Sequence, residues 1–324
     1  MNRRRTFGKV VVLSVVSLII TTPFYAYVTS RILSPTNDIV QLRWPAGPIP
    51  WQMNSKPASN ISGSRPFDGV VRQSFTTWSS IPTAIITFAE GTPTTAGFGY
   101  DGKNVVVANL TTDQWVNLGV GDDVLAFTLL KWADTAGNTT PAGQPAAFAG
   151  QILEADIVFD PLVPFSADDT KAPSKFDFQS VLTHEIGHLL GLDHSPINSA
   201  TMFWVAGSHS VTQRSLSADD IAGVSSIYPS AAFMSKGSVQ GVVRTTTNVP
   251  VYGAVVVALN AGGQPVGSAV TDPNGQYSIM GLDGGSYTVY AQPLDGFTTS
   301  DDFDTLSDIY PAKTVMTGFN ARFR

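Results

Sequence analysis

The sequence His184-Glu-Ile-Gly-His188-Leu-Leu-Gly191-Leu-Asp-His194 holds three of the four histidines in this 324-residue chain. His184 and His188 are four residues apart, so on a helix their imidazole rings project from one face. Two neutral imidazoles on one face are a common way of holding a Zn²⁺ ion. Glu185, beside the first histidine, is one of only three glutamates in the chain. The spacing therefore predicts a metal-binding helix that carries a carboxyl group near the ion.

A glycine follows the second histidine by three residues, at Gly191. A glycine there can adopt the left-handed conformation, end the helix and turn the chain back. This turn would bring His194 to the same ion as a third ligand. Three protein ligands leave a fourth position for water, which is the arrangement of a catalytic site rather than a structural one. Glu185 lies off the histidine face but within reach of that water, so it is the predicted general base.

The residues on both sides of this motif indicate an α+β fold. Apolar residues at helical spacing, such as Val71, Phe75 and Trp78, predict a helix well before the motif. Ser217 and Asp220 form an N-cap pair that opens the last helix. Strands early in the chain and helices late are typical of α+β order. The predicted helices span residues 66–81, 176–192 and 217–228, and the predicted strands 39–44, 49–53, 84–89, 104–109, 124–130 and 152–159.

After residue 236 the sequence changes to short alternating strands separated by Gly-rich turns. Asp272-Pro-Asn-Gly275 and Asp283-Gly-Gly285 are turn signals, and no helical pattern follows residue 236. We therefore expect a small all-β sandwich at residues 237–324, after a linker at residues 230–236. The catalytic unit is expected at residues 38–229.

The first thirty residues have the pattern of an export signal. Three arginines at positions 3–5 and Lys9 precede an apolar run from Val10 to Ile20. The run can be extended to Val28, which is nearly long enough to cross a bilayer. Residues 1–30 are therefore predicted to be a cleaved signal peptide or a retained membrane anchor, with a buried core helix as the third alternative. Either of the first two places the body outside the cytoplasm, secreted or attached to the cell surface.

Composition excludes several classes of protein. Hydrophobic residues make up 43% of the chain and charged residues 14%, so bulk disorder is excluded. The net charge is −6 and the body has no long run of Lys or Arg, which argues against nucleic-acid binding. The chain has no cysteine, so a disulfide framework, a thiolate metal site and a cysteine nucleophile are all excluded.

The motif from His184 to His194 resembles that of the metzincin metalloproteases, and Ser195 directly after it resembles the matrixin branch, which includes the matrix metalloproteinases. Met202 stands at the spacing expected for the methionine that this family places under its zinc on a tight turn. The resemblance covers about residues 40–229 and implies a twisted mixed β-sheet with three helices. The C-terminal unit resembles the carboxypeptidase-regulatory-like β-sandwich, through Gly241-Val-Val243 and Thr271-Asp-Pro-Asn-Gly-Gln-Tyr277. Such modules lack catalytic residues of their own and are expected to act as spacers or binding modules.

The resemblance implies a zinc-dependent endopeptidase that hydrolyses proteins or peptides. His184, His188 and His194 would bind one catalytic Zn²⁺, and Glu185 would activate the attacking water. Substrate would lie extended along an edge strand, for which Val124–Leu130 is the candidate. Two alternatives stay open: a non-catalytic surface adhesion or binding protein on a relic metzincin fold, and a protein in which zinc only staples the fold.

This sequence departs from the animal matrixins in three ways. The lack of cysteine makes their cysteine-switch latency impossible, and His209 alone cannot build their second, structural zinc site. Trp204 stands where those proteins have a proline, which changes a wall of the primary specificity pocket. Matrixins commonly bind Ca²⁺ as well, and clustered carboxylates are its usual ligands. The candidate calcium ligands are Asp156, Asp160, Asp168 and Asp169.

Overall fold

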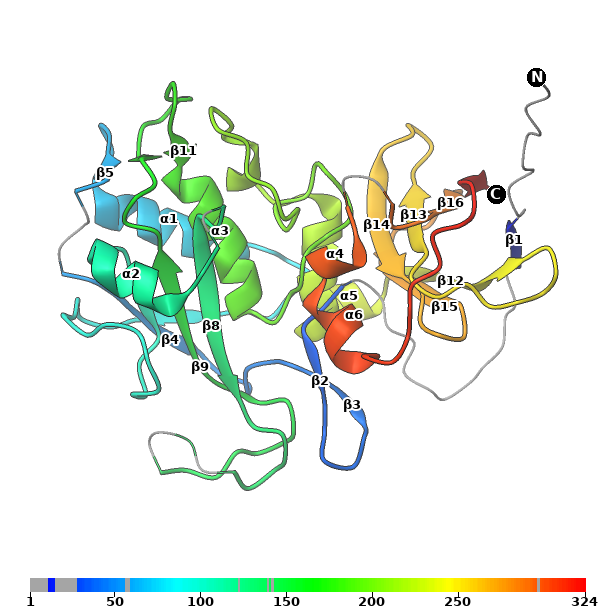
Figure 1. Ribbon diagram of the computed structural model, residues 1–324, viewed down its shortest axis with the longest axis horizontal. Helices are drawn as coiled ribbons and strands as arrows, with labels where there is room; N and C mark the ends of the chain where they lie inside the picture. Colours follow the sequence, from blue (N-terminus) through cyan, green and yellow to red (C-terminus); the bar gives the residue numbers. More distant parts are fainter. Residues whose placement is uncertain are drawn as a thin grey trace, which may run out of the picture.

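The computed structural model describes residues 11–14, 28–55, 59–121, 123–138, 140, 143–295 and 298–324. Most of the predicted signal or anchor segment lies outside these residues; of its apolar run only Val11–Ser14 is described, and it forms a strand, β1. No helix among the residues just given is long and apolar enough to cross a membrane. Figure 1 shows a larger mixed part that contains α1, α2 and α3 beside a smaller β part, with α4, α5 and α6 between the two.

A five-stranded mixed sheet forms the larger part, in the order β6-β4-β7-β9-β8. Only β8 runs antiparallel to its neighbour, with Thr128 opposite Ile157, and the other pairs are parallel. β8 stands last in this order, so among the described residues it is an edge strand that pairs on one side only. The strands are β4 (Ile49–Met53), β6 (Phe88–Glu90), β7 (Val105–Val107), β8 (Ala126–Trp132) and β9 (Ile152–Phe159).

Apolar side chains on both faces of this sheet explain why its central strands are buried. On one face, Phe159 packs with Phe178 and Trp78 in the main core, and the Trp78 indole donates to the Thr183 carbonyl at 2.8 Å. On the other face, Val158 packs with Trp115 of the short helix α2. The helices of this part are α1 (Phe67–Ser79), α2 (Thr112–Leu118), α3 (Phe178–Leu189), the 3₁₀ turn η1 (Thr212–Arg214) and α4 (Ala218–Ile227).

The mixed sheet with helices confirms the α+β prediction, but several local expectations were inaccurate. The helix expected from residue 176 begins at Phe178, because residues 176–177 pair with residues 165–166 and Asp177 caps the helix by accepting from Ser180 N at 2.7 Å. The strand expected at residues 84–89 is reduced to β6, because a turn follows Ile81. The short strands of this part are β2 (Arg31–Leu33), β3 (Ile39–Gln41), β5 (Ile61–Ser62), β10 (Phe165–Ser166) and β11 (Phe176–Asp177).

The C-terminal part is a β-sandwich, as expected, built from sheets ordered β1-β12-β15 and β14-β13-β16-β17. Its core alternates along the strands, with Val243, Val256 and Ile279 facing inward. The strands are β1 (Val11–Ser14), β12 (Gly237–Thr245), β13 (Val255–Leu259), β14 (Pro265–Val270), β15 (Gln276–Leu282), β16 (Thr288–Gln292) and β17 (Arg322–Phe323).

Two helical segments in the C-terminal part were not expected from the sequence. The predicted linker contains α5 (Ala231–Met234), whose Phe233 is buried next to Gly281. The tail contains the 3₁₀ turn η2 (Ser300–Asp302) and α6 (Asp304–Ile309), although no helix was predicted after residue 236. Phe303, Leu306 and Ile309 are buried at three-residue spacing, which fixes a helical turn against the body.

Candidate active site

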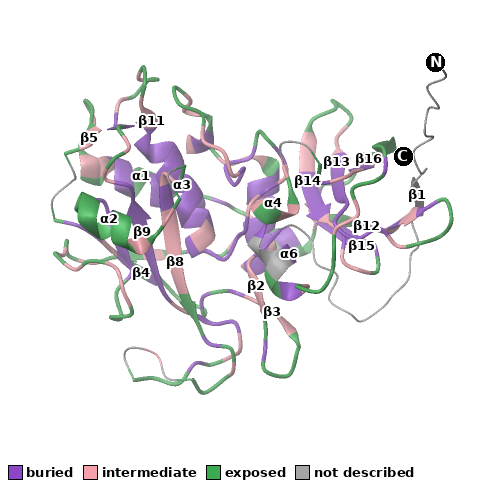
Figure 2. Ribbon diagram, in the orientation of Figure 1, coloured by how far each residue is buried: buried purple, intermediate pink, exposed green. Residues whose placement is uncertain are grey.

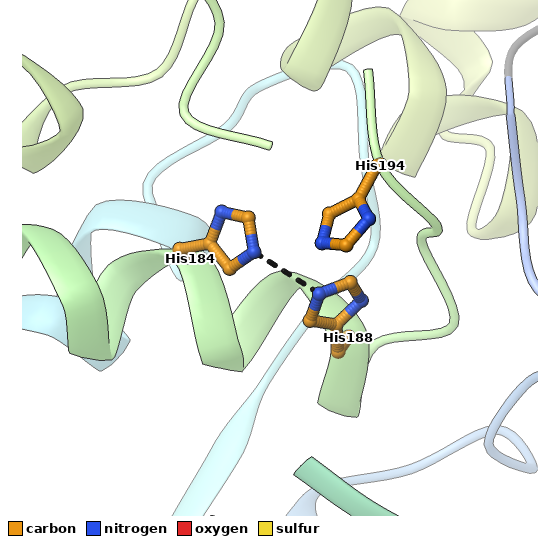
Figure 3. Close-up of side chains that lie close together, drawn as sticks. All are labelled: His184, His188 and His194. Carbon is orange, nitrogen blue, oxygen red and sulfur yellow. Dashed lines mark hydrogen bonds between the residues drawn. The ribbon is translucent and has the colours of Figure 1, made fainter. Parts of the chain in front are cut away.

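Helix α3 and the loop that follows it bring the three histidines together. His184 and His188 lie on one face of α3, and Figure 3 shows their rings and that of His194 converging on one point. The potential ligand atoms of the three residues all lie within 4.8 Å of one another. The Nε2 atoms of His184 and His188 are 3.1 Å apart. Figure 2 shows α3 buried along most of its length, so the surrounding core holds the helix that carries the site.

Each ring is held through its Nδ1 atom by a backbone carbonyl. His184 Nδ1 lies 2.8 Å from Thr201 O, His188 Nδ1 lies 2.9 Å from Leu192 O, and His194 Nδ1 lies 2.7 Å from Asp302 O. A carbonyl oxygen can only accept, so each Nδ1 carries the proton and each Nε2 carries a lone pair. This is the tautomer that a metal ion requires of an Nε2 ligand.

The lone pairs would repel one another without a cation between them, which makes the group fit a metal ion. Burial and the neighbouring histidines lower the pKa of His184 well below its ordinary value, and burial and His194 lower that of His188 to about 3. The rings of His184 and His188 therefore stay neutral at physiological pH. Two nitrogens bound to one tetrahedral Zn²⁺ would lie about 3.3 Å apart, close to the distance between these two Nε2 atoms.

Glu185 lies beside the triad, on the side of the edge strand β8. Its side chain is 5% exposed, and Thr128 Oγ1 is 2.7 Å from Glu185 Oε2 and 2.9 Å from the Glu185 carbonyl oxygen. Burial raises the pKa of Glu185 to about 7, and the hydrogen bond from Thr128 acts in the opposite direction. A carboxyl group with such a pKa can both take up and release a proton near neutral pH.

The turn after α3 depends on a glycine, as the sequence suggested. Gly191 has a φ of +91°, and a Cβ built there would lie 2.3 Å from the Leu42 carbonyl oxygen. The turn is paired with residues 28–30, since Ser30 N donates to Gly191 O at 2.9 Å and Asp193 N donates to Val28 O at 3.2 Å. The close approach of the two backbone segments thus fixes the path of the chain from the end of α3 to His194.

We expect Gly191→Ala to destabilise the protein by about 3 kcal/mol, because an alanine adds left-handed strain and a clash with the Leu42 carbonyl. Gly119→Ala is the matched control, since Gly119 has a φ of +67° but open space around its Cβ position. The control should lose only about 1 kcal/mol in chemical denaturation of the metal-free protein. Equal losses for the two variants would contradict the argument.

Met202 lies beneath α3, on a turn whose Thr201 carbonyl also contacts His184. Met202 is 2% exposed, and a Cβ at Gly187 would lie 2.2 Å from Met202 Sδ, so a larger residue at position 187 would require the Met202 side chain to shift. Asp220 anchors the turn by accepting from Thr201 N at 2.8 Å, Met202 N at 2.9 Å and Ser217 N at 2.7 Å. The carboxylate that caps α4 therefore also fixes the carbonyl that orients His184.

The other residues singled out as possible metal ligands do not join the triad. Across the described ranges, the three histidines form the sole group of three or more His, Cys, Asp or Glu side chains arranged to share an ion. Asp156 and Asp160 accept backbone N–H bonds, Asp168 accepts from Ser64 N, and Asp169 is paired with Arg65. His209 Nε2 accepts from Ser174 N at 2.6 Å. The calcium sites therefore stay a prediction.

Three contacts of the site were missed by the sequence interpretation: those of Thr128, Asp220 and the Asp302 carbonyl. The sequence identified Asp220 only as half of a capping pair. Its second role, as the acceptor for Thr201 N and Met202 N, has no local sequence pattern. A backbone carbonyl such as that of Asp302 carries no side-chain signal at all.

Comparison with known proteins agrees with this geometry. A family model described as Matrixin matches residues 135–229, and one described as Carboxypeptidase regulatory-like domain matches residues 238–304. The chain contains a matrixin-like metzincin domain. Over these residues the sequence resemblance to matrixins and to the carboxypeptidase-regulatory-like sandwich is confirmed.

The relatives of this matrixin-like domain are plant and animal metalloproteinases. The chain is 41% identical over 61 residues to Metalloendoproteinase 4-MMP of Arabidopsis thaliana, covering 19% of this chain and 18% of the relative. It is 45% identical over 69 residues to Metalloendoproteinase 1 of Glycine max (19% and 21%) and 46% identical over 56 residues to Matrilysin of Rattus norvegicus (17% and 21%). The chain thus matches about a fifth of the length of these relatives.

Proposed function

We propose that this protein is an exported, zinc-dependent endopeptidase. The observation that carries the proposal is the convergence of three histidine side chains beside the buried carboxyl group of Glu185. Three ligands with a carboxyl group next to them in the sequence suit catalysis better than a structural metal site, which is usually closed by four ligands. The names of the relatives agree with a metalloendopeptidase.

When bound by His184, His188 and His194, Zn²⁺ would supply the Lewis acid that polarises the substrate carbonyl and acidifies a water. Glu185 would accept the proton of that water and return it to the leaving amine, because its buried carboxyl group follows directly after His184 and is held by Thr128. Thr128 restrains the Glu185 carboxyl group during this transfer. The carbonyls bonded to the three Nδ1 atoms keep the rings in the ligating tautomer.

The substrate chain would pair with the free side of β8, as the sequence led us to expect. β8 is the edge of the sheet, and Thr128 in its middle contacts Glu185. A peptide added along this edge would gain backbone hydrogen bonds and pass in front of the triad. We also propose export through residues 1–30, on the basis of the basic and apolar pattern alone.

The test is a zinc titration combined with peptide cleavage. We expect the full chain, freed of metal by a chelator, to bind one Zn²⁺ and to cleave a mixed peptide library only when zinc is restored. Mass spectrometry of the products would give the cleavage preference. Zinc binding without any cleavage would instead support a binding protein on a relic fold, and no zinc binding would refute the proposal.

A further inference from the structure

One of the three histidines is held from outside the matrixin-like domain. The acceptor for His194 Nδ1 is the carbonyl of Asp302, 108 residues later in the chain, at 2.7 Å. The acceptors for His184 and His188, Thr201 and Leu192, both lie in the loops just after α3. The C-terminal tail therefore supplies the backbone carbonyl for His194, whereas the matrixin-like domain itself supplies the carbonyls for His184 and His188.

The tail segment that carries this carbonyl is packed into both halves of the molecule. Phe303, next to Asp302, is fully buried in an apolar cluster shared with Ile197 and Ala200 of the loop after His194 and with Val257 of the sandwich. The Tyr252 hydroxyl donates to Leu306 O at 3.2 Å. Figure 1 shows α6 lying between the two parts, near β2. The Asp302 carbonyl is thus held in place by packing.

A buried polar bridge ties the next residue of the site to the sandwich. Ser195 Oγ donates to Asp219 Oδ2 at 2.5 Å, and Ser268 Oγ on β14 donates to Asp219 Oδ1 at 2.9 Å. Asp219 is 6% exposed and Ser268 is 0% exposed. The C-terminal part thus contacts His194 directly through Asp302, and it reaches Ser195 through Asp219 of α4.

We propose that the C-terminal unit completes the metal centre, with the Asp302 carbonyl as the positioning group for His194. This inference deepens the proposed function and rests on the triad binding zinc. It replaces the expectation of a spacer or separate binding module with an integral role: when the tail undocks, His194 loses its fixed orientation and tautomer, and the ion keeps two well-placed ligands.

The test compares Phe303→Ala with Ile279→Ala in otherwise unchanged protein. Both substitutions open a cavity in a fully buried apolar site of the C-terminal part, but Ile279 belongs to a different cluster. Thermal unfolding of the metal-free variants checks that their stability losses are comparable. We expect Phe303→Ala to weaken zinc binding, measured by competition with a chromophoric chelator, by about 10–100-fold, and Ile279→Ala to leave it within about twofold.

A spectroscopic readout separates positioning from general damage. With Co²⁺ in the site, the Nδ1 protons of the three histidines give separate exchangeable NMR signals. The His194 signal should exchange faster with solvent in Phe303→Ala and be unchanged in Ile279→Ala, since exchange reports local opening. If Phe303→Ala does not fold, Phe303→Leu should show a smaller loss in the same direction.

The outcomes distinguish this inference from the proposed function. Equal zinc affinity of the Phe303 and Ile279 variants, with an unchanged His194 signal, would overturn the role of the tail while leaving the zinc site intact. Failure of the unsubstituted protein to bind zinc would refute the proposed function and this inference together.

Discussion

Glu185→Gln should lower the rate of peptide cleavage by about 10²–10⁴-fold while zinc binding stays within about twofold of the original value. Glutamine has the same shape as glutamate and can still accept the hydrogen bond from Thr128, but it cannot take a proton from water. The Nε2 atoms of the triad are not altered by the change. The effect should therefore fall on kcat and leave the metal site in place.

The matched control for this variant is Glu90→Gln, the same chemical change at a residue of β6 that pairs with Arg72 on the surface. It should keep full activity, because β6 lies at the opposite edge of the sheet from β8. Cleavage is followed with the best substrate from the library, and zinc content by metal analysis of the same samples. Undiminished cleavage by Glu185→Gln would refute the role of Glu185 as general base.

The part of the site that was predictable is the part encoded by local spacing. The i, i+4 relation of His184 and His188 is a property of any α-helix, and Gly191 marked the turn that delivers His194. Asp302 could not be found in this way, because its carbonyl is placed by the packing of Phe303 more than a hundred residues from the motif. Long-range contacts between backbone and side chain have no periodicity to detect.

The helices also divide into those that local sequence spacing predicts and those that it does not. Helix α1 was predictable from its apolar spacing, whereas α2 was missed although Thr111 and Gln114 form a capping box and Gly119 ends the helix with a φ of +67°. Its seven residues bury one large side chain, Trp115, so the apolar pattern was too short to recognise. The tail helix α6 was missed for a similar reason, since it is stabilised by a core to which distant residues contribute.

The Met202 turn depends on the carboxylate of Asp220, which is the acceptor for three backbone N–H groups. The side chain is 2% exposed. Burial raises the pKa of this carboxyl group, and the bonds from Met202, Thr201 and Ser217 lower it in opposition. Each of the three N–H donors needs an acceptor lone pair. An ionised carboxylate offers enough of them, because it only accepts and carries no proton that would itself need an acceptor. Removing the Asp220 carboxylate would leave three buried N–H groups without a hydrogen-bond acceptor.

We therefore expect Asp220→Ala to destabilise the metal-free protein by about 3–5 kcal/mol, because each N–H group left without an acceptor costs about 1–3 kcal/mol and some regain water. Zinc binding should weaken at least about tenfold as well, because the Thr201 carbonyl that orients His184 loses its anchor. Asp272→Ala is the control, since Asp272 accepts from Asn274 N and Gln276 N in a turn of the sandwich. It should lower stability in chemical denaturation without changing zinc affinity. Loss of stability in Asp220→Ala with unchanged zinc affinity would show that the Met202 turn holds the fold but does not position His184.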